Sequence, residues 1–182
     1  SLIGALGVAF VLVSVATARQ DPTIVTNPPE KFSMRVVATG LDGPWEITWG
    51  PDQQIWATER RGRRVIRINP ADGTRTTLLS LPEAHTTFTQ DGLLGLALHP
   101  DLMKGLVGSN YVYIAFTYDD AAGPALARRL GIRRYQYEEK TRTLSSPVDV
   151  IMGLPTHDDH VGGRLVIGRD LKLYLTIGDQ GS

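Results

Sequence analysis

Cysteine is missing from the 182 residues of this chain, and so is any excess charge of one sign. Without cysteine the chain cannot use thiolate catalysis, thiolate-bound zinc or disulfide bonds. Nineteen Lys and Arg residues balance nineteen Asp and Glu residues, which removes the electrostatic reason to expect nucleic acid or an anionic membrane surface as a partner. These absences leave a small, neutral ligand as the expected partner.

Charge is also absent from residues 1–18, a mostly apolar run that ends in Ala16-Thr17-Ala18. Small residues at such an end are typical of a cleavage site, so we expect a signal peptide at 1–18 and a periplasmic or secreted protein. An uncleaved membrane anchor is the alternative, but the run is slightly shorter than a spanning helix usually is, and we expect no stable membrane insertion. A Pro-rich linker is expected at 19–33 and the folded domain at 34–182.

Helical periodicity is lacking beyond the linker, whereas short β-rich runs bounded by Gly, Pro, Asp and Asn recur throughout the chain. The sequence therefore predicts an all-β fold. The segment 121–130 has some helical character but contains Gly123 and Pro124, which favour a loop. The clearest predicted strands are 34–38, 46–49, 55–58, 65–69, 76–81, 111–117, 134–137, 164–167 and 172–177.

A loose repeat organises these strands: an apolar run, a turn with Asp in third place, and a second run of alternating residues. The turn aspartates are Asp52, Asp101 and Asp170, at spacings of 49 and 69 residues. Outer hairpins with matching turns follow at 65–81 and 134–151. Two antiparallel hairpins per repeat predict the four-stranded blades of a β-propeller. A β-sandwich is the alternative, because short strands with regular turns also build that fold.

The number of repeats indicates an incomplete propeller. Three inner runs make two to three blades, and an open arc of blades would leave unpaired edges and an uncovered apolar face. The chain also opens on Ser1 without a Met or a basic leader, and it closes on a strand and a turn at 176–182. We expect further residues at both ends, and we expect the 182-residue chain alone to be inactive.

Two of the four histidines, His157 and His160, share the loop 153–163 with Asp158 and Asp159. Glycines in this loop would let a ligand approach the backbone. A zinc or iron site and a solvated polar turn are alternatives, but adjacent ligands rarely converge on one ion, and the sequence offers no matching second cluster. We favour a catalytic loop and predict no metal ligand in this chain.

Propeller geometry would bring distant residues to this loop. The first strand of each blade lines the central channel, so His160 and Asp179 would lie near one channel mouth. A carboxylate on one ring nitrogen leaves the other free to accept a proton, although Asp179 in a capping turn is the alternative. Gln90 enters its own inner strand at the equivalent place, and its amide suits sugar hydroxyls, although Gln-Asp-Gly is also a common turn. We expect structural roles for His99, at the opposite strand end, and for Arg164.

Three groups of residues, in this order, carry a resemblance to a known family. They are 49–52 with 55–60, 90–95 with 99–101, and 159–160 with 163–168 and 176–181. Over roughly residues 36–181 the chain resembles the soluble quinoprotein (PQQ-dependent) glucose dehydrogenases and the related aldose sugar dehydrogenases. The resemblance implies a longer, six-bladed periplasmic propeller that binds PQQ and Ca²⁺ in its channel; it leaves the electron acceptor open and allows a homodimer.

The resemblance also implies roles for four residues. His160 would be the general base and contact the cofactor, Asp179 would support it, and Asp159 and Gln90 would bind the sugar. The anomeric hydroxyl would give its proton to His160 while C1 delivers hydride to PQQ, polarised by Ca²⁺, and the aldose would become a lactone. The calcium ligands and most PQQ ligands are expected beyond Ser182.

A propeller of another class is the alternative function: a non-catalytic ligand-binding module or a lactone hydrolase. A hydrolase would need metal-liganding carboxylates on several blades, and a binding module would not need a base. Both would use the same channel mouth for their ligand.

Overall fold

The computed structural model of the protein describes residues 33–87 and 89–180, and this part of the chain consists of strands, turns and loops without a helix. The all-β prediction is thereby confirmed. The expected signal peptide at 1–18 and, apart from Ser33, the expected linker at 19–33 lie outside the described residues. All the strands belong to one unit, Val36–Ser182. They are β1 Pro44–Trp49, β2 Ile55–Glu59, β3 Arg64–Ile68, β4 Arg75–Ser80, β5 Leu93–Leu98, β6 Tyr111–Asp119, β7 Arg128–Glu138, β8 Thr143–Pro155, β9 Gly162–Ile167 and β10 Leu173–Ile177.

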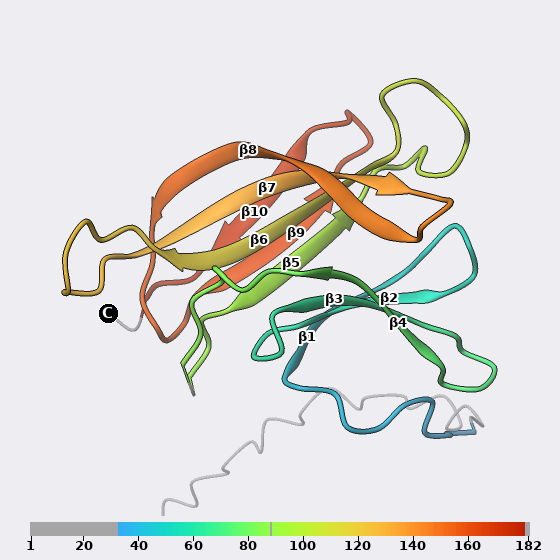
Figure 1. The fold of residues 1–182 in the computed structure, drawn as a ribbon, viewed down its shortest axis with the longest axis horizontal. Helices are drawn as coiled ribbons and strands as arrows, with labels where there is room; N and C mark the ends of the chain where they lie inside the picture. The colour runs from blue at the N-terminus through green and yellow to red at the C-terminus, as the bar shows by residue number, and fades with distance from the viewer. Residues whose placement is uncertain (1–32, 88, 181–182) are drawn as a thin grey trace, which may run out of the picture. The chain divides into compact units, whose positions relative to one another are not determined.

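These strands form three antiparallel sheets in strict chain order (Figure 1). β1–β4 make one four-stranded sheet, β5–β8 make a second, and β9 pairs with β10. Successive four-stranded meanders are the blades of a propeller. The described chain thus contains two complete blades and the first hairpin of a third, which confirms the expected two to three blades.

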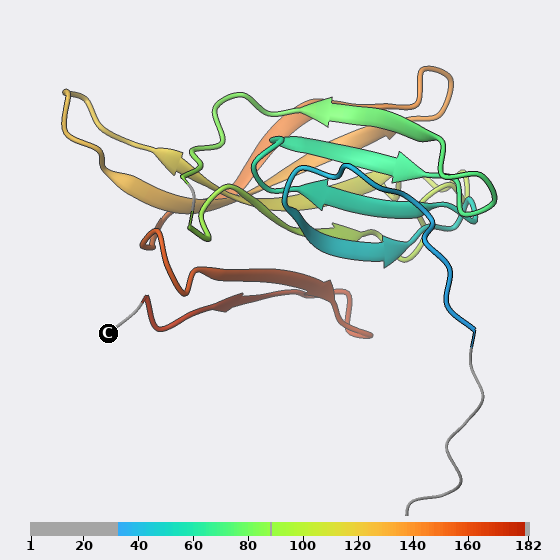
Figure 2. The ribbon, with the colours of Figure 1, turned by 90° about the horizontal axis from the view of Figure 1, so that it is seen from below.

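The blades stack face to face, and two buried clusters fill the spaces between them. One cluster joins the first blade to the second, with Trp56 and Val65 from the first and Leu93 and Phe116 from the second. The other cluster joins the second blade to the β9–β10 hairpin, which forms a separate layer in Figure 2. Each blade therefore depends on its neighbour for burial of its apolar face.

Strand β5 lies between the other two inner strands, β1 and β9, and its side chains are covered on both faces. Leu93 and Leu96 point into the first cluster, and Leu94 and Ala97 point into the second. A strand buried on both faces needs no polar positions, which explains its continuous apolar sequence. Gly95 allows β5 and β9 to approach closely, because a Cβ atom there would lie 2.1 Å from the carbonyl oxygen of Gly163.

Two of the three turn aspartates of the repeat, Asp52 and Asp170, have a shared physical role, whereas Asp101 accepts a hydrogen bond from the ammonium group of Lys104. Asp52 accepts a hydrogen bond from the backbone N–H of Gln54, and Asp170 accepts one from that of Lys172. Such contacts two residues along the chain stabilise a tight turn. Asp52 also accepts hydrogen bonds from the Trp56 indole at 3.0 Å and the Arg67 guanidinium at 2.7 Å, so it fixes the outer end of the first blade.

Three differences from the prediction are larger than two residues. The segment 34–38 is not a strand; its adjacent residues Val37 and Ala38 instead pack on the apolar residues Ala57 and Ile66. The hairpin strand predicted to end at 151 continues to Pro155, because β8 pairs with β7 up to Arg129. For the same reason β7 begins at Arg128, inside the segment predicted to be a loop.

Candidate active site

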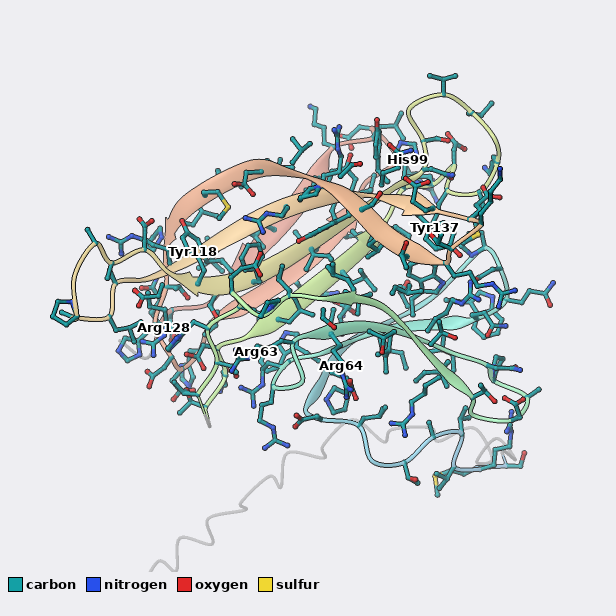
Figure 3. All side chains as sticks on the ribbon, in the orientation of Figure 1. Arg63, Arg64, His99, Tyr118, Arg128 and Tyr137 are labelled. Atoms are coloured by element: carbon teal, nitrogen blue, oxygen red, sulfur yellow. The ribbon has the colours of Figure 1, made fainter. Side chains whose placement is uncertain are left out.

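The ends of the three inner strands form two distinct regions of the channel. The C-terminal ends of β1, β5 and β9 line an open groove of about 440 Å³, with Trp49, His99 and Ile167 among its walls. His99 lies here, and its Nδ1 accepts a hydrogen bond from the backbone N–H of Asp101. The N-terminal ends of the inner strands lie at the other mouth of the channel. His99 and Arg128 accordingly lie at opposite ends of the second blade (Figure 3). His99 is therefore far from the predicted site.

His160 and Asp179, which the sequence analysis expected to meet, are in contact. Nδ1 of His160 lies 2.8 Å from Oδ1 of Asp179. The loop before β9 carries His160 and the turn after β10 carries Asp179, and the register that pairs Gly162 with Ile177 brings the two segments together. An ionised carboxylate can only accept, so Nδ1 carries the proton and Nε2 has the free lone pair.

The close approach of these two segments requires a glycine at position 178. A Cβ atom at Gly178 would lie 1.8 Å from the carbonyl oxygen of His160, a distance that no side chain tolerates. The backbone N–H of Gly178 donates a hydrogen bond to the carbonyl of Val161 at 3.1 Å. The backbone therefore sets the distance between the imidazole and the carboxylate.

His160 itself adopts a left-handed backbone conformation with a φ of 48°, which is uncommon for a residue with a side chain. Its N–H donates to Oδ1 of Asp159, and Oδ2 of Asp159 lies 4.0 Å from Nε2. The pKa of His160 is raised above its ordinary value, first by the hydrogen bond to Asp179 and then by the charge of Asp159. The imidazole side chain is half exposed, so part of it is open to a ligand.

Gln90 lies at the same mouth as the histidine loop. Its backbone N–H donates a hydrogen bond of 2.8 Å to the carbonyl of Asp158, two residues before His160. The structure thus joins the segment before β5 to the loop before β9. Segments from two blades meet here through this backbone hydrogen bond, and the sugar-binding role of the Gln90 side chain stays a prediction.

The four polar residues of the histidine loop do not act as one cluster. His157 pairs with Asp158, at 2.6 Å between Nδ1 and Oδ1, whereas His160 turns to Asp179. Within residues 33–87 and 89–180, no three His, Asp or Glu side chains converge as metal ligands would. The loop therefore presents two separate imidazole–carboxylate pairs.

A buried carboxylate beside the site escaped the sequence analysis, which assigned Asp91 only to a turn. Asp91 is fully buried and forms an ion pair with Arg128, with 2.9 Å between Oδ2 and Nε. Its position directly before the apolar run of β5 was a usable signal, because a carboxylate buried with that run requires a cation as partner.

Arg164, for which a structural role was expected, lies beside Glu46. The guanidinium of Arg164 lies 3.7 Å from the carboxylate of Glu46, which is almost entirely buried on β1. The pair joins the inner strands of the first and third blades inside the groove, in agreement with a structural role for Arg164.

None of the described segments forms a helix that is long and apolar enough to cross a membrane.

Comparison with known proteins gives this arrangement a family. The model of the glucose/sorbosone dehydrogenase family matches residues 41–182. Quinoprotein glucose dehydrogenase B of Acinetobacter calcoaceticus is 43% identical over 155 residues, which cover 84% of this chain and 32% of that protein. The chain thus spans about a third of the length of this curated relative.

Solved structures agree with the sequence match. The PQQ-bound form of aldose sugar dehydrogenase from Streptomyces coelicolor superposes with a TM-score of 0.69 at 31% identity, covering 86% of this chain and 45% of that chain. The soluble aldose sugar dehydrogenase of Escherichia coli in its apo-form has the same fold, with a TM-score of 0.65 at 22% identity over 81% of this chain and 41% of that chain. On the family match and these likenesses, the chain belongs to the glucose/sorbosone dehydrogenase family.

Proposed function

We propose that this chain supplies the general base and part of the sugar site of a PQQ-dependent dehydrogenase that oxidises an aldose at C1 to the lactone. The observation that carries the proposal is the 2.8 Å contact between Nδ1 of His160 and Asp179 at the channel mouth. The relatives support the activity, because one is a quinoprotein glucose dehydrogenase and another is a sugar dehydrogenase in its PQQ-bound form. The chain would work within a longer propeller, exported by residues 1–18.

His160 can take the substrate proton because Asp179 holds the proton on Nδ1. The anomeric hydroxyl would bind at Nε2 and pass its proton there as the C1 hydrogen leaves with its electron pair. Loss of one proton and one hydride converts the alcohol carbon to the carbonyl carbon of the lactone. Asp179 would stabilise the imidazolium that results, without taking the proton itself.

Sugar binding would involve Asp159 and Gln90. Oδ2 of Asp159 lies 4.0 Å from Nε2 of His160, so a hydroxyl next to the reacting one could bind the carboxylate. Gln90 comes from the neighbouring blade, and its amide can donate and accept hydrogen bonds to hydroxyl groups. A neutral, polyhydroxylated ligand suits this set of groups.

The same mouth suits PQQ, because the His160 side chain is half exposed and a planar ligand could lie against it. PQQ, when bound, would supply the acceptor for the two electrons that leave C1. His160 is the residue of this chain that we assign to contact it. We assign Ca²⁺ and the remaining PQQ contacts to residues beyond Ser182.

The activity test uses the full-length protein, loaded with PQQ and Ca²⁺, with an artificial dye as electron acceptor. Aldoses should reduce the dye, and the product should be the lactone. Tight binding of sugars without dye reduction would instead favour a non-catalytic propeller, and hydrolysis of added lactones would favour a lactonase.

A further inference from the structure

Asp91 is a buried carboxylate that the proposed reaction does not use. It lies directly after Gln90 and before β5, and none of its surface is exposed. Placing a charged carboxylate in such surroundings costs free energy unless cations and hydrogen-bond donors compensate. The partners of Asp91 therefore indicate what the residue does.

The two carboxylate oxygens of Asp91 have different partners. Oδ1 accepts hydrogen bonds from the backbone N–H and the hydroxyl of Thr87, at 2.6 and 2.7 Å. Oδ2 accepts from Nε of Arg128 at 2.9 Å, and the buried Nε2 atom of His85 lies 3.7 Å away. The carboxylate thus ties Thr87 to Arg128, the first residue of β7.

The backbone around Asp91 is held as firmly as its side chain. Its carbonyl accepts hydrogen bonds from the guanidinium of Arg60 at 2.8 Å and the hydroxyl of Thr86 at 3.0 Å. The next residue, Gly92, donates to the hydroxyl of Thr117 on β6 at 2.7 Å. The turn after β2, the loop before β5 and strand β6 therefore fix the main chain on one side of Gln90.

Gln90 is held on its other side by the hydrogen bond from its N–H to Asp158. A long polar side chain on a loop loses conformational entropy when it binds a ligand, and a fixed backbone lowers that cost. The buried ion pair acts on the residue adjacent to the one that we assign to the sugar. Its location indicates that it orients the binding residue as well as stabilising the fold.

We propose that Asp91 is a positioning residue, with Arg128 as its counter-ion, that holds Gln90 in place for the sugar hydroxyls. The proposal rests on the proposed function of Gln90. It also assigns a role to the β6–β7 hairpin, because Arg128 is the first residue of β7 after the connecting loop (Figure 3). A change that displaces the Arg128 guanidinium would then alter sugar affinity without any contact between Arg128 and the sugar.

The first test is Asp91→Asn in the full-length protein loaded with PQQ and Ca²⁺. The Asn side chain keeps the shape but removes the charge that pairs with Arg128. We expect KM for glucose to rise about tenfold with kcat changed less than about twofold, because binding is lost while His160 and Asp179 are intact. Arg128→Gln removes the ion pair from the other side and should likewise raise KM with little change in kcat. It replaces Asp91→Asn as the test if the Asn variant folds poorly.

A readout that does not require activity is hydrogen exchange at the backbone amides of Thr87 and Gln90. Both amides should exchange faster in Asp91→Asn. The Thr87 amide donates to the Asp91 carboxylate, and the Gln90 amide donates to Asp158 from the backbone that Asp91 holds in place. Asp52→Asn is the matched control, because it also breaks a largely buried carboxylate–arginine pair but lies at the outer end of the first blade. It should change neither KM nor these exchange rates.

Combination with Gln90→Ala decides whether Asp91 acts through its neighbour. In the Gln90→Ala background, Asp91→Asn should raise KM no further. An equal rise in both backgrounds, or an unchanged KM and unchanged exchange in Asp91→Asn, would overturn the proposal. If Gln90→Ala leaves KM unchanged, the sugar role of Gln90 is wrong, and exchange at the Gln90 amide alone then decides whether Asp91 positions it.

Discussion

Nδ1 of His160 and Oδ1 of Asp179 lie 2.8 Å apart across the open end of the β9–β10 hairpin, although 19 positions separate the two residues in the chain. Antiparallel pairing of the two strands brings their flanking loops to one end, and a glycine at each contact allows the backbones to meet. Two short strands therefore suffice to build an oriented imidazole.

Asp179→Asn should shift the pH dependence of the reaction to lower pH. The carboxylate raises the pKa of His160, and the base acts only when it is neutral, so kcat/KM increases as the pH rises through that pKa. Without the carboxylate the pKa falls and the acidic limb moves down with it. The measurement is kcat/KM against pH for both proteins. An acidic limb at the same pH in both would show that Asp179 does not act on the base.

Asp159→Asn should move the same limb in the same direction but by less, because the charge of Asp159 is the smaller contribution to the raised pKa of His160. It should also raise KM for the sugar, because the carboxylate is assigned to a hydroxyl. Equal shifts for the two variants would contradict the assignment of Asp179 as the residue that orients His160. Titration of His160 by NMR gives the pKa directly.

Gly178→Ala should lower kcat by at least about tenfold while the protein stays folded, because small displacements of catalytic groups are costly. The added methyl group would lie 1.8 Å from the carbonyl oxygen of His160, so the loop must move and the imidazole with it. Gly123→Ala is the control, since a methyl group there meets no atom within 4 Å. Full activity in the Gly178 variant would show that the site tolerates this displacement.

Thr58→Val should destabilise the contact between the first two blades. The buried hydroxyl donates to the carbonyl of Leu94 at 2.6 Å and accepts from the N–H of Glu46 at 3.0 Å. Valine fills the same space but leaves both backbone groups unsatisfied, at a cost of about 2 kcal/mol or more. Urea unfolding measures the loss. Thr58→Ser retains both hydrogen bonds and should be the more stable variant; the reverse order would rule out the hydroxyl as the cause.

The repeat in the sequence predicted the blades because the same physical requirement recurs in the first and the third of them. Asp52 and Asp170 both close a tight turn between the first two strands of a blade by bonding the backbone two residues later. The continuous apolar sequence of β5 likewise follows from its burial between the two apolar clusters on its faces. These are local features, and local sequence carries them.

The features that sequence reasoning missed depend on distant packing. Asp91 and Arg128 are 37 positions apart, and their pairing follows from how far the β6–β7 hairpin extends before it returns. The segment 34–38 is mostly apolar, and its Val37 and Ala38 pack on the first sheet, although the segment pairs with no strand. In both cases the partner, which the local pattern does not contain, decides the structure.

The most direct measurement of the central claim is kcat for His160→Ala in the full-length protein loaded with PQQ and Ca²⁺, compared with His157→Ala. Both histidines lie in one exposed loop and each faces a carboxylate, but only His160 contacts Asp179. Removal of the general base in His160→Ala should lower kcat more than about a hundredfold, while the absorption spectrum shows that PQQ is still bound. The kcat of His157→Ala should stay within about twofold of that of the unmodified protein. Similar small losses in both variants would contradict the assignment of His160 as the base.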